Sequence, residues 1–449
     1  MVARTLNRMS GIGVGFVIFG VMLMLMVLRV PIGIAMFIVG ACGYVYLTGS
    51  PPALLNSLKN LGYARLSNYD LVVIPLFLLM GQFATHGGLS RGLFRFVSAF
   101  LGHRKGGVAI AAIGACAGFG AICGSSLATA ATMGQVALPE LRRFGYSGAL
   151  ATGALAAGGT LGIMIPPSVP LVIYAILTQE SIGKLFVAAV LPGIIAMLGY
   201  MLVVRIVVTV NPRAGPAGPA VAWTEKLTSL VAVVPVLAVF FVVIVGIYGG
   251  WANPTEAAAI GAAACGVLAV TTGGMRVRGL IDSALGTAQA TAMIYLVLLG
   301  ADMLNTTLAL SQMPGELAAF VKTSGLAPLV VMAMILLIYI FLGCVMDALA
   351  MILLTIPIFY PIVMGLDFGL APQDQSIWFG ILALMVVEIG LVHPPVGMNV
   401  YIINRLARDV PLSETFKGVI PFLLSDAVRI TLLVLFPVIS LYFVHTFRR

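Results

Sequence analysis

The sequence predicts an all-α polytopic membrane protein whose two halves form an inverted repeat. Of its 449 residues, 61% are hydrophobic and only 9% are charged, whereas a soluble domain is about 25% charged. Its apolar runs have the length of membrane helices, and the alternating pattern of an outer-membrane barrel is absent. The formal net charge of +9 is typical of basic cytoplasmic loops and does not indicate nucleic-acid binding.

A Pro- and Gly-rich stretch at 211–220, which cannot form a helix, divides the apolar segments into two sets. The first half (1–210) has apolar segments at 11–28, 31–48, 70–86, 107–122, 127–140, 149–164, 168–178 and 185–210. After a linker at 211–226, the second half (227–449) has them at 227–248, 255–272, 283–310, 327–342, 346–364, 376–392, 396–404 and 418–446. The apolar run near the N-terminus continues to Leu47, so we expect spans there rather than a signal peptide.

Three groups of residues recur in the two halves at nearly the same offset, which indicates a duplicated unit. Pro31, Cys42 and Gly43 have the spacing of Pro254, Cys265 and Gly266, and Gly124 and Pro139 resemble Gly343 and Pro357. GIMIPPS at 162–168 resembles GLVHPPV at 390–396. In each half, two short apolar segments joined by a small-residue turn precede a helix interrupted at Pro-Pro. We interpret these as re-entrant hairpins at about 107–140 and 327–364, and broken helices at about 149–178 and 376–404.

The charges around the two hairpins predict that they open to opposite sides of the membrane. Arg104, Lys105, Arg142 and Arg143 flank the first hairpin, so both of its ends are expected in the cytoplasm. No Lys or Arg occurs between Lys322 and Arg405, and the loop after the second hairpin contains Asp367 and Asp374. Oppositely oriented repeats with broken helices are typical of secondary transporters. These charges leave the side of the C-terminus open.

The first hairpin tip and the break that follows it contain candidate cation and carboxylate ligands. Helix interruptions leave unpaired carbonyl groups that suit Na⁺, and unpaired N–H groups that suit an anion. The candidates are Gly124, Ser125 and Ser126 at the tip, Thr129 one turn beyond, and Thr160, Gly162, Pro166 and Ser168 at the break. Gly118, Gly120 and Ala128 are interpreted instead as small residues that let helices approach closely.

The second hairpin tip and its break provide a corresponding set. The candidates are Gly343 and Asp347 at the tip and Gly390, His393, Pro394, Gly397 and Asn399 at the break. Intramembrane carboxylates are costly and therefore indicate function. This favours Asp347 as a cation or gating residue, whereas Asp302 and Glu388 are equally compatible with helix–helix hydrogen bonds. For His393, capping of the broken helix is favoured over proton sensing.

No enzyme motif is present, since the GxSxG, HExxH and Walker patterns are all missing. The cysteines lie within apolar runs without zinc-ligand spacing, so we interpret them as packing residues. The sequence thus predicts a non-enzyme without a cofactor or a metal other than Na⁺, driven by an ion gradient.

Three motifs resemble the large membrane subunit of tripartite ATP-independent periplasmic (TRAP) transporters. They are GSSLATAATMGQVALPELRRFGY, GGTLGIMIPPSVPLVIYAILTQESIGKLFVAAVLPG and MVVEIGLVHPPVGMNVYII. The resemblance implies an elevator-type transporter of the bacterial inner membrane that imports a small carboxylate with Na⁺. It also implies two partners, a small four-helix membrane subunit and a periplasmic substrate-binding protein.

The same resemblance distributes the candidate residues over two Na⁺ sites, one at each tip and break, with the substrate between the tips. The substrate candidates are Ser125, Ser126, Thr129, Asp347 and Asn399. His393 stands where many members would have Thr, so the second site is expected to differ in detail. The alternatives are a stand-alone Na⁺/carboxylate symporter and an ion channel, although occluded broken-helix sites favour alternating access over a pore.

Overall fold

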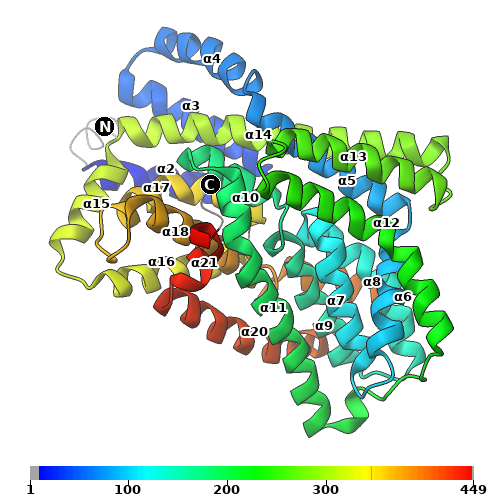
Figure 1. The fold of residues 1–449 in the computed structure, drawn as a ribbon. Helices are drawn as coiled ribbons and strands as arrows, with labels where there is room; N and C mark the ends of the chain where they lie inside the picture. The colour runs from blue at the N-terminus through cyan, green and yellow to red at the C-terminus, as the bar shows by residue number, and fades with distance from the viewer. Residues whose placement is uncertain (1–9, 345, 447–449) are drawn as a thin grey trace.

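The computed structural model describes residues 10–344 and 346–446, and within these residues every regular element is helical (Figure 1). The first half comprises α2 (Gly11–Val27), α3 (Ile32–Thr48), α4 (Pro51–Leu66), η1 (Tyr69–Val72), α5 (Val73–His86), α6 (Leu89–Leu101), α7 (Gly107–Cys123), α8 (Ser126–Arg143), α9 (Gly148–Met164), α10 (Val169–Thr178) and α11 (Ile182–Val210). A short η2 (Pro212–Ala214) lies in the linker.

The second half comprises α12 (Trp223–Tyr248), α13 (Pro254–Thr271), α14 (Val277–Leu310), α15 (Met313–Thr323), α16 (Pro328–Gly343), α17 (Ala348–Met364), α18 (Pro372–Gly390), α19 (Met398–Leu406), α20 (Leu412–Leu435) and α21 (Val438–Thr446). Six of the described helices are long and apolar enough to cross a membrane, and the bent pair α9–α10 would make a seventh. The predicted all-helical polytopic fold is therefore confirmed.

Several elements differ from the sequence-based expectation. Helices α4, α6 and α15 were not predicted, because polar and charged residues interrupt their apolar runs. None of the residues of α4 is buried, and the helix projects from the body of the molecule (Figure 1). The segment 418–446 was expected to be one span, but α20 ends at Leu435 and α21 begins after Pro437. Proline disfavours the helical conformation of the residue before it, and Phe436 has non-helical angles there.

The first hairpin, α7 and α8, has both of its ends on one face of the molecule. Gly106 at its start donates its backbone N–H to the Gly215 carbonyl at 2.9 Å, and Ser147 just beyond its end donates to the Ala214 carbonyl at 3.0 Å. The Tyr146 hydroxyl accepts the Val108 N–H at 3.1 Å, and burial raises the pKa of the Tyr146 phenol. The Pro- and Gly-rich linker therefore packs across the open end of the hairpin.

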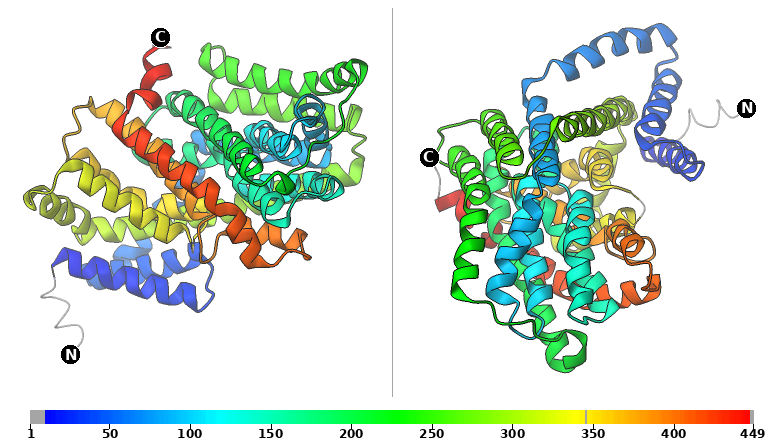
Figure 2. Two further views of the ribbon diagram at one scale, coloured as in Figure 1. Left: turned by 90° about the horizontal axis from the view of Figure 1, so that it is seen from below. Right: turned by 90° about the vertical axis from the view of Figure 1, so that its right-hand side faces the viewer.

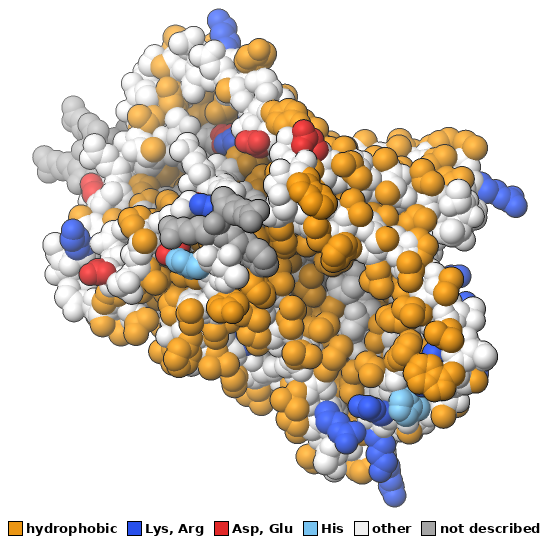
Figure 3. All heavy atoms as spheres, in the orientation of Figure 1, with side chains coloured by type: hydrophobic (Ala, Val, Ile, Leu, Met, Phe, Trp, Pro, Cys, Tyr) orange, Lys and Arg blue, Asp and Glu red, His pale blue; other side chains and the backbone are white. Residues whose placement is uncertain are grey.

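Basic residues gather on this same face. Figure 3 shows Lys and Arg side chains at the lower end of the molecule and a broad apolar surface above them. A hollow there is lined by Arg104, Lys105 and Arg205 together with apolar residues. Such a distribution is typical of the cytoplasmic side of an inner-membrane protein.

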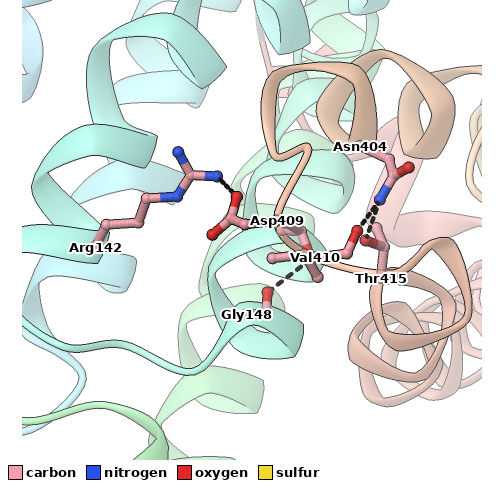
Figure 4. A network of polar contacts seen from close by, with 7 residues as sticks. Arg142, Gly148, Asn404, Asp409, Val410 and Thr415 are labelled. Carbon is pink, nitrogen blue, oxygen red and sulfur yellow. Dashed lines mark hydrogen bonds and ion pairs between the residues drawn. The ribbon is translucent and has the colours of Figure 1, made fainter.

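The loop between α19 and α20 lies beside the end of the first hairpin. Arg142 forms an ion pair with Asp409, and Asn404 donates to the Val410 carbonyl at 2.8 Å and to Thr415 Oγ1 at 3.2 Å (Figure 4). From this loop α20 runs obliquely across the molecule (Figure 2). The broken pair α18–α19 thus ends on the face where α9 begins.

The opposite face carries the end of the second hairpin and the start of α18. Gln375 donates to the Val363 carbonyl at 2.7 Å, which joins the end of α17 to α18. One Asp374 carboxylate oxygen lies 3.3 Å from His445 Nε2 of α21. The described C-terminal helix therefore ends on the face of Asp374, opposite Asp409, and the two broken pairs cross the molecule in opposite directions.

Candidate functional site

The first hairpin turns at Gly124 and Ser125. Gly124 has a left-handed conformation with φ of +63°, which glycine adopts without steric cost. Ser125 is the N-cap of α8, and its hydroxyl accepts the Ala128 N–H at 3.4 Å. A Cβ atom at Gly124 would lie 3.0 Å from the Pro167 carbonyl oxygen. The tip therefore touches the break between α9 and α10.

That break bends the helix axis by 41°. Pro166 and Pro167 are joined by a cis peptide bond, and neither has an N–H to continue the helix. On the last turn of α9, a Cβ at Gly162 would lie 2.5 Å from Thr129 Oγ1 and 2.8 Å from the Ser125 carbonyl oxygen. The structure thus brings the predicted tip and break residues together, with glycine at the closest approach.

Asn399 joins this tip to the second half of the chain. Its side-chain N–H groups donate to Ser126 Oγ at 2.7 Å and to the Ala156 carbonyl at 3.3 Å. From its position in the sequence Asn399 was expected at the second tip, whereas its side chain lies at the first one. The residue spacing could not reveal this, because the contact crosses between the two repeats.

Three buried oxygen atoms in this region have no oxygen or nitrogen hydrogen-bond partner among the described residues, although the Cys123 thiol interacts with the Thr129 hydroxyl. They are Thr129 Oγ1 from the hairpin, Ser168 Oγ from the break, and Asn399 Oδ1 from α19. Buried polar atoms nearly always have a partner, and hard cations prefer oxygen ligands. The oxygen donors here therefore fit Na⁺.

The second tip meets the second break in a similar way. A Cβ at Gly343 would lie 2.7 Å from Gly390 Cα, so the two backbones are in direct contact. The Cys344 sulfur lies 3.7 Å from His393 Nδ1 and 3.5 Å from the Pro394 carbonyl oxygen. Beyond the cis Pro394–Pro395 bond, Gly397 is the N-cap of α19 and has a φ of +60°. A thiol and an imidazole line this contact, in place of the hydroxyl groups at the first tip.

Asp347 is the N-cap of α17. One of its carboxylate oxygens accepts the Ala350 N–H at 2.7 Å. Ser125 has the same N-cap role in the first hairpin. Among the described contacts, none joins the Asp347 carboxylate to the second break. The His393 ring contacts Cys344 and the adjacent Pro394 carbonyl.

The Thr160 hydroxyl points away from the hairpin. It donates to the Ala157 carbonyl at 2.7 Å and lies 3.3 Å from the Tyr200 hydroxyl on α11. Thr160 could therefore contribute to a tip site through its backbone but not through its side chain.

The structure gives Asp302 a partner and shows two further buried charged residues, Asp426 and Arg429. Asp302 of α14 forms a bidentate ion pair with Arg65 of α4, which accounts for it as a helix–helix contact. Asp426 and Arg429 are buried on α20, and neither was among the residues predicted from the sequence. The signal was present, because both lie within an apolar segment, the criterion that identified Glu388.

Comparison with known proteins identifies a family to which this chain is similar. Residues 19–439 match the family described as "Tripartite ATP-independent periplasmic transporter, DctM component". The chain is 35% identical to a C4-dicarboxylate TRAP transporter large permease protein of Pseudomonas aeruginosa over 90% of this chain and 92% of that protein. It is 30% identical to a sialic acid TRAP transporter large permease protein of Vibrio cholerae over 92% and 94% of the two chains.

A longer relative and a solved structure with a similar fold complete the comparison. The isethionate TRAP transporter permease protein DctMQ of Oleidesulfovibrio alaskensis is 29% identical over 95% of this chain, which covers 66% of that protein. Among solved structures, the YdaH transporter of Alcanivorax borkumensis superposes with a TM-score of 0.60 at 15% identity, over 86% of this chain and 89% of that one. The resemblance drawn from the sequence motifs is thereby confirmed.

Proposed function

The chain belongs to the TRAP transporter family as its DctM component, a large permease of the inner membrane, and we propose that it imports a small organic acid together with Na⁺. The family consists of transporters rather than enzymes. The observation that carries the Na⁺ proposal is the set of unpaired buried oxygens, Thr129 Oγ1, Ser168 Oγ and Asn399 Oδ1, where the first tip meets its break. A Na⁺ ion bound to them would satisfy atoms that the fold leaves without partners.

The substrate proposal rests on the helix ends and on the relatives. Relatives named for C4-dicarboxylates, sialic acid and isethionate suggest an anionic substrate. The first turns of α8 and α17 present N–H groups at the two hairpin tips, and helix N-termini attract anions. A carboxylate between the tips would lie near Ser125, Ser126, Thr129, Asp347 and Asn399.

The mechanism and the partners follow from the family. We propose an elevator-type movement of the hairpins and broken helices, a separate small membrane subunit, and a periplasmic protein that delivers the substrate. The relative DctMQ, of which this chain covers 66%, is long enough to hold an additional subunit. This chain is matched almost end to end by the relatives named large permease.

Uptake into proteoliposomes tests the ion and the partner separately. With the small subunit and the binding protein present, uptake of a C4-dicarboxylate or sialic acid should collapse when K⁺ replaces Na⁺ at constant voltage. Unchanged uptake in K⁺ would remove Na⁺ from the mechanism. Robust saturable uptake without a binding protein would instead favour a stand-alone symporter.

A substitution at Thr129 tests the ion site itself. Thr129→Val replaces an unpaired hydroxyl by a methyl group of similar size, so we expect normal folding and a higher half-saturating Na⁺ concentration. Thr291→Val is the matched control, because Thr291 Oγ1 on α14 is also buried without a partner but lies outside both hairpins and both broken pairs. Equal Na⁺ dependence in the two variants would exclude the Thr129 hydroxyl as a ligand.

A further inference from the structure

A buried polar cluster occupies the space between α9, α11, α18 and α20. The Tyr200 hydroxyl of α11 donates to Asp426 Oδ2 at 3.0 Å and lies 3.3 Å from Thr160 Oγ1. The second Asp426 oxygen lies 2.8 Å from Arg429 Nη2, and the Arg429 guanidinium lies 5.6 Å from the centre of the Tyr200 ring. Asp426 and Arg429 are only 1% and 3% exposed, so their charges are held within the molecule.

Glu388 of α18 completes the cluster. It is fully buried, and neither of its carboxylate oxygens has a hydrogen-bond partner among the described residues. Its helix, α18, packs against α20, which carries Asp426 and Arg429. An unpaired carboxyl group of α18 is therefore buried on a helix that packs against the one carrying the ion pair.

The two outer members of the cluster lie close to the two breaks. Thr160 is two residues before Gly162, which touches the first hairpin tip, and Glu388 is two residues before Gly390, which touches the second. Tyr200, Asp426 and Arg429 lie between them. Buried polar contacts thus run from the first broken helix through α11 to α20, and α20 packs against α18 of the second broken helix.

We propose that Tyr200, Asp426 and Arg429 are positioning residues that couple the two ion sites, an inference that rests on the Na⁺ sites of the proposed function. A buried ion pair is weak evidence for stability, because desolvation offsets its attraction. The hydrogen bond from Tyr200 to Asp426, however, joins α11 to the ion pair on α20 and so fixes the two helices relative to each other. An ion that shifts one break must then change the energy of the other, which is the condition for cooperative binding.

The Na⁺ dependence of uptake tests the coupling. In the full complex, wild-type uptake should rise with Na⁺ with a Hill coefficient above one. Tyr200→Phe removes only the hydroxyl that joins α9 and α20. Because one buried hydrogen bond of ordinary strength is lost, we expect the half-saturating Na⁺ concentration to rise about three- to ten-fold and the Hill coefficient to fall towards one. The KM for substrate at saturating Na⁺ should stay unchanged.

Tyr295→Phe is the matched control, because the Tyr295 hydroxyl donates to the Leu71 carbonyl at 3.1 Å and has no part in the cluster. Glu388→Gln is the second test, since it preserves the shape of the side chain but replaces its carboxyl group by an amide. It should move the same two quantities in the same direction. If thermal unfolding shows that Tyr200→Phe is too unstable to assay, Glu388→Gln alone tests the coupling.

The outcomes separate the coupling from the proposed function. A Na⁺-dependent wild type with an unchanged Hill coefficient and half-saturation in both variants would overturn the coupling and leave Na⁺ symport intact. A fall in maximal uptake alone would also overturn it, because that is what a merely structural role predicts. A wild type without Na⁺ dependence would overturn both.

Discussion

Gly162→Ala tests whether the contact between the first tip and its break sets the geometry of an ion site. A Cβ at this position would lie 2.5 Å from Thr129 Oγ1 and 2.8 Å from the Ser125 carbonyl. Ordinary van der Waals contact begins near 3.4 Å, so Thr129 or the break must retreat by about 0.9 Å. Both neighbours belong to the proposed site, and metal–ligand distances tolerate only about 0.2 Å of error.

The expected effect on stability is the difference of two opposing terms. Overpacking of a buried contact costs about 1–3 kcal/mol, whereas replacing glycine by alanine within a helix gains about 1 kcal/mol. The free energy of unfolding should therefore fall by about 0–2 kcal/mol, and the protein should still fold. The half-saturating Na⁺ concentration should rise by about ten- to a hundred-fold, as for other changes that displace metal ligands.

The assay is Na⁺-dependent uptake in proteoliposomes together with thermal unfolding in detergent. Gly118→Ala is the control, because Gly118 lies in the same hairpin and a Cβ there would find its nearest neighbour, Leu93 Cδ2, at 3.5 Å. That variant should be slightly stabilised and should transport normally. Identical Na⁺ dependence of the two variants would refute the reasoning from the close contact.

Three other predictions concern single features of the structure. Asn399→Ala should lower the free energy of unfolding by about 1–3 kcal/mol in a chemical denaturation experiment, because it leaves two buried groups without their donor; a neutral effect would contradict the contact. Arg143→Cys and Asp374→Cys, in a cysteine-free background, should react with an impermeant thiol reagent from opposite sides of the membrane, and reaction from one side would refute the inverted repeat. Asp347→Ser should keep the helix cap, with a change in stability below about 1 kcal/mol, but should weaken Na⁺-dependent uptake; full activity would show that the carboxylate is only a cap.

Segments whose apolar residues form long uninterrupted runs were predicted well from the sequence. Burial in lipid or protein requires such runs, so the hairpin helices α7 and α8 fall near their predicted limits. Helix α4 has no buried residue, so no apolar pattern marks it. The break at Pro437 was overlooked because the residues around it are all apolar.

The candidate site shows the same limit at the level of side chains. Sequence patterns located the tips and the breaks, because a membrane segment tolerates paired prolines only where protein or a polar site surrounds the freed backbone groups. They could not show that Thr160 faces Tyr200, since a rotation along α9 decides it. Nor could they show that Asn399 contacts Ser126, because that contact depends on how the two repeats pack.

The two hairpin tips are built alike but differ in charge, and the difference is informative. Ser125 and Asp347 are both N-caps whose side-chain oxygen accepts a backbone N–H three residues later. Serine and aspartate are about equally good N-caps, and the neutral one suffices at the first tip. Folding therefore does not require the charge of Asp347, although placing even a partly buried carboxylate within a membrane segment is costly. Capping alone does not account for that cost, and we propose that a compensating cation or an electrostatic role in substrate passage does.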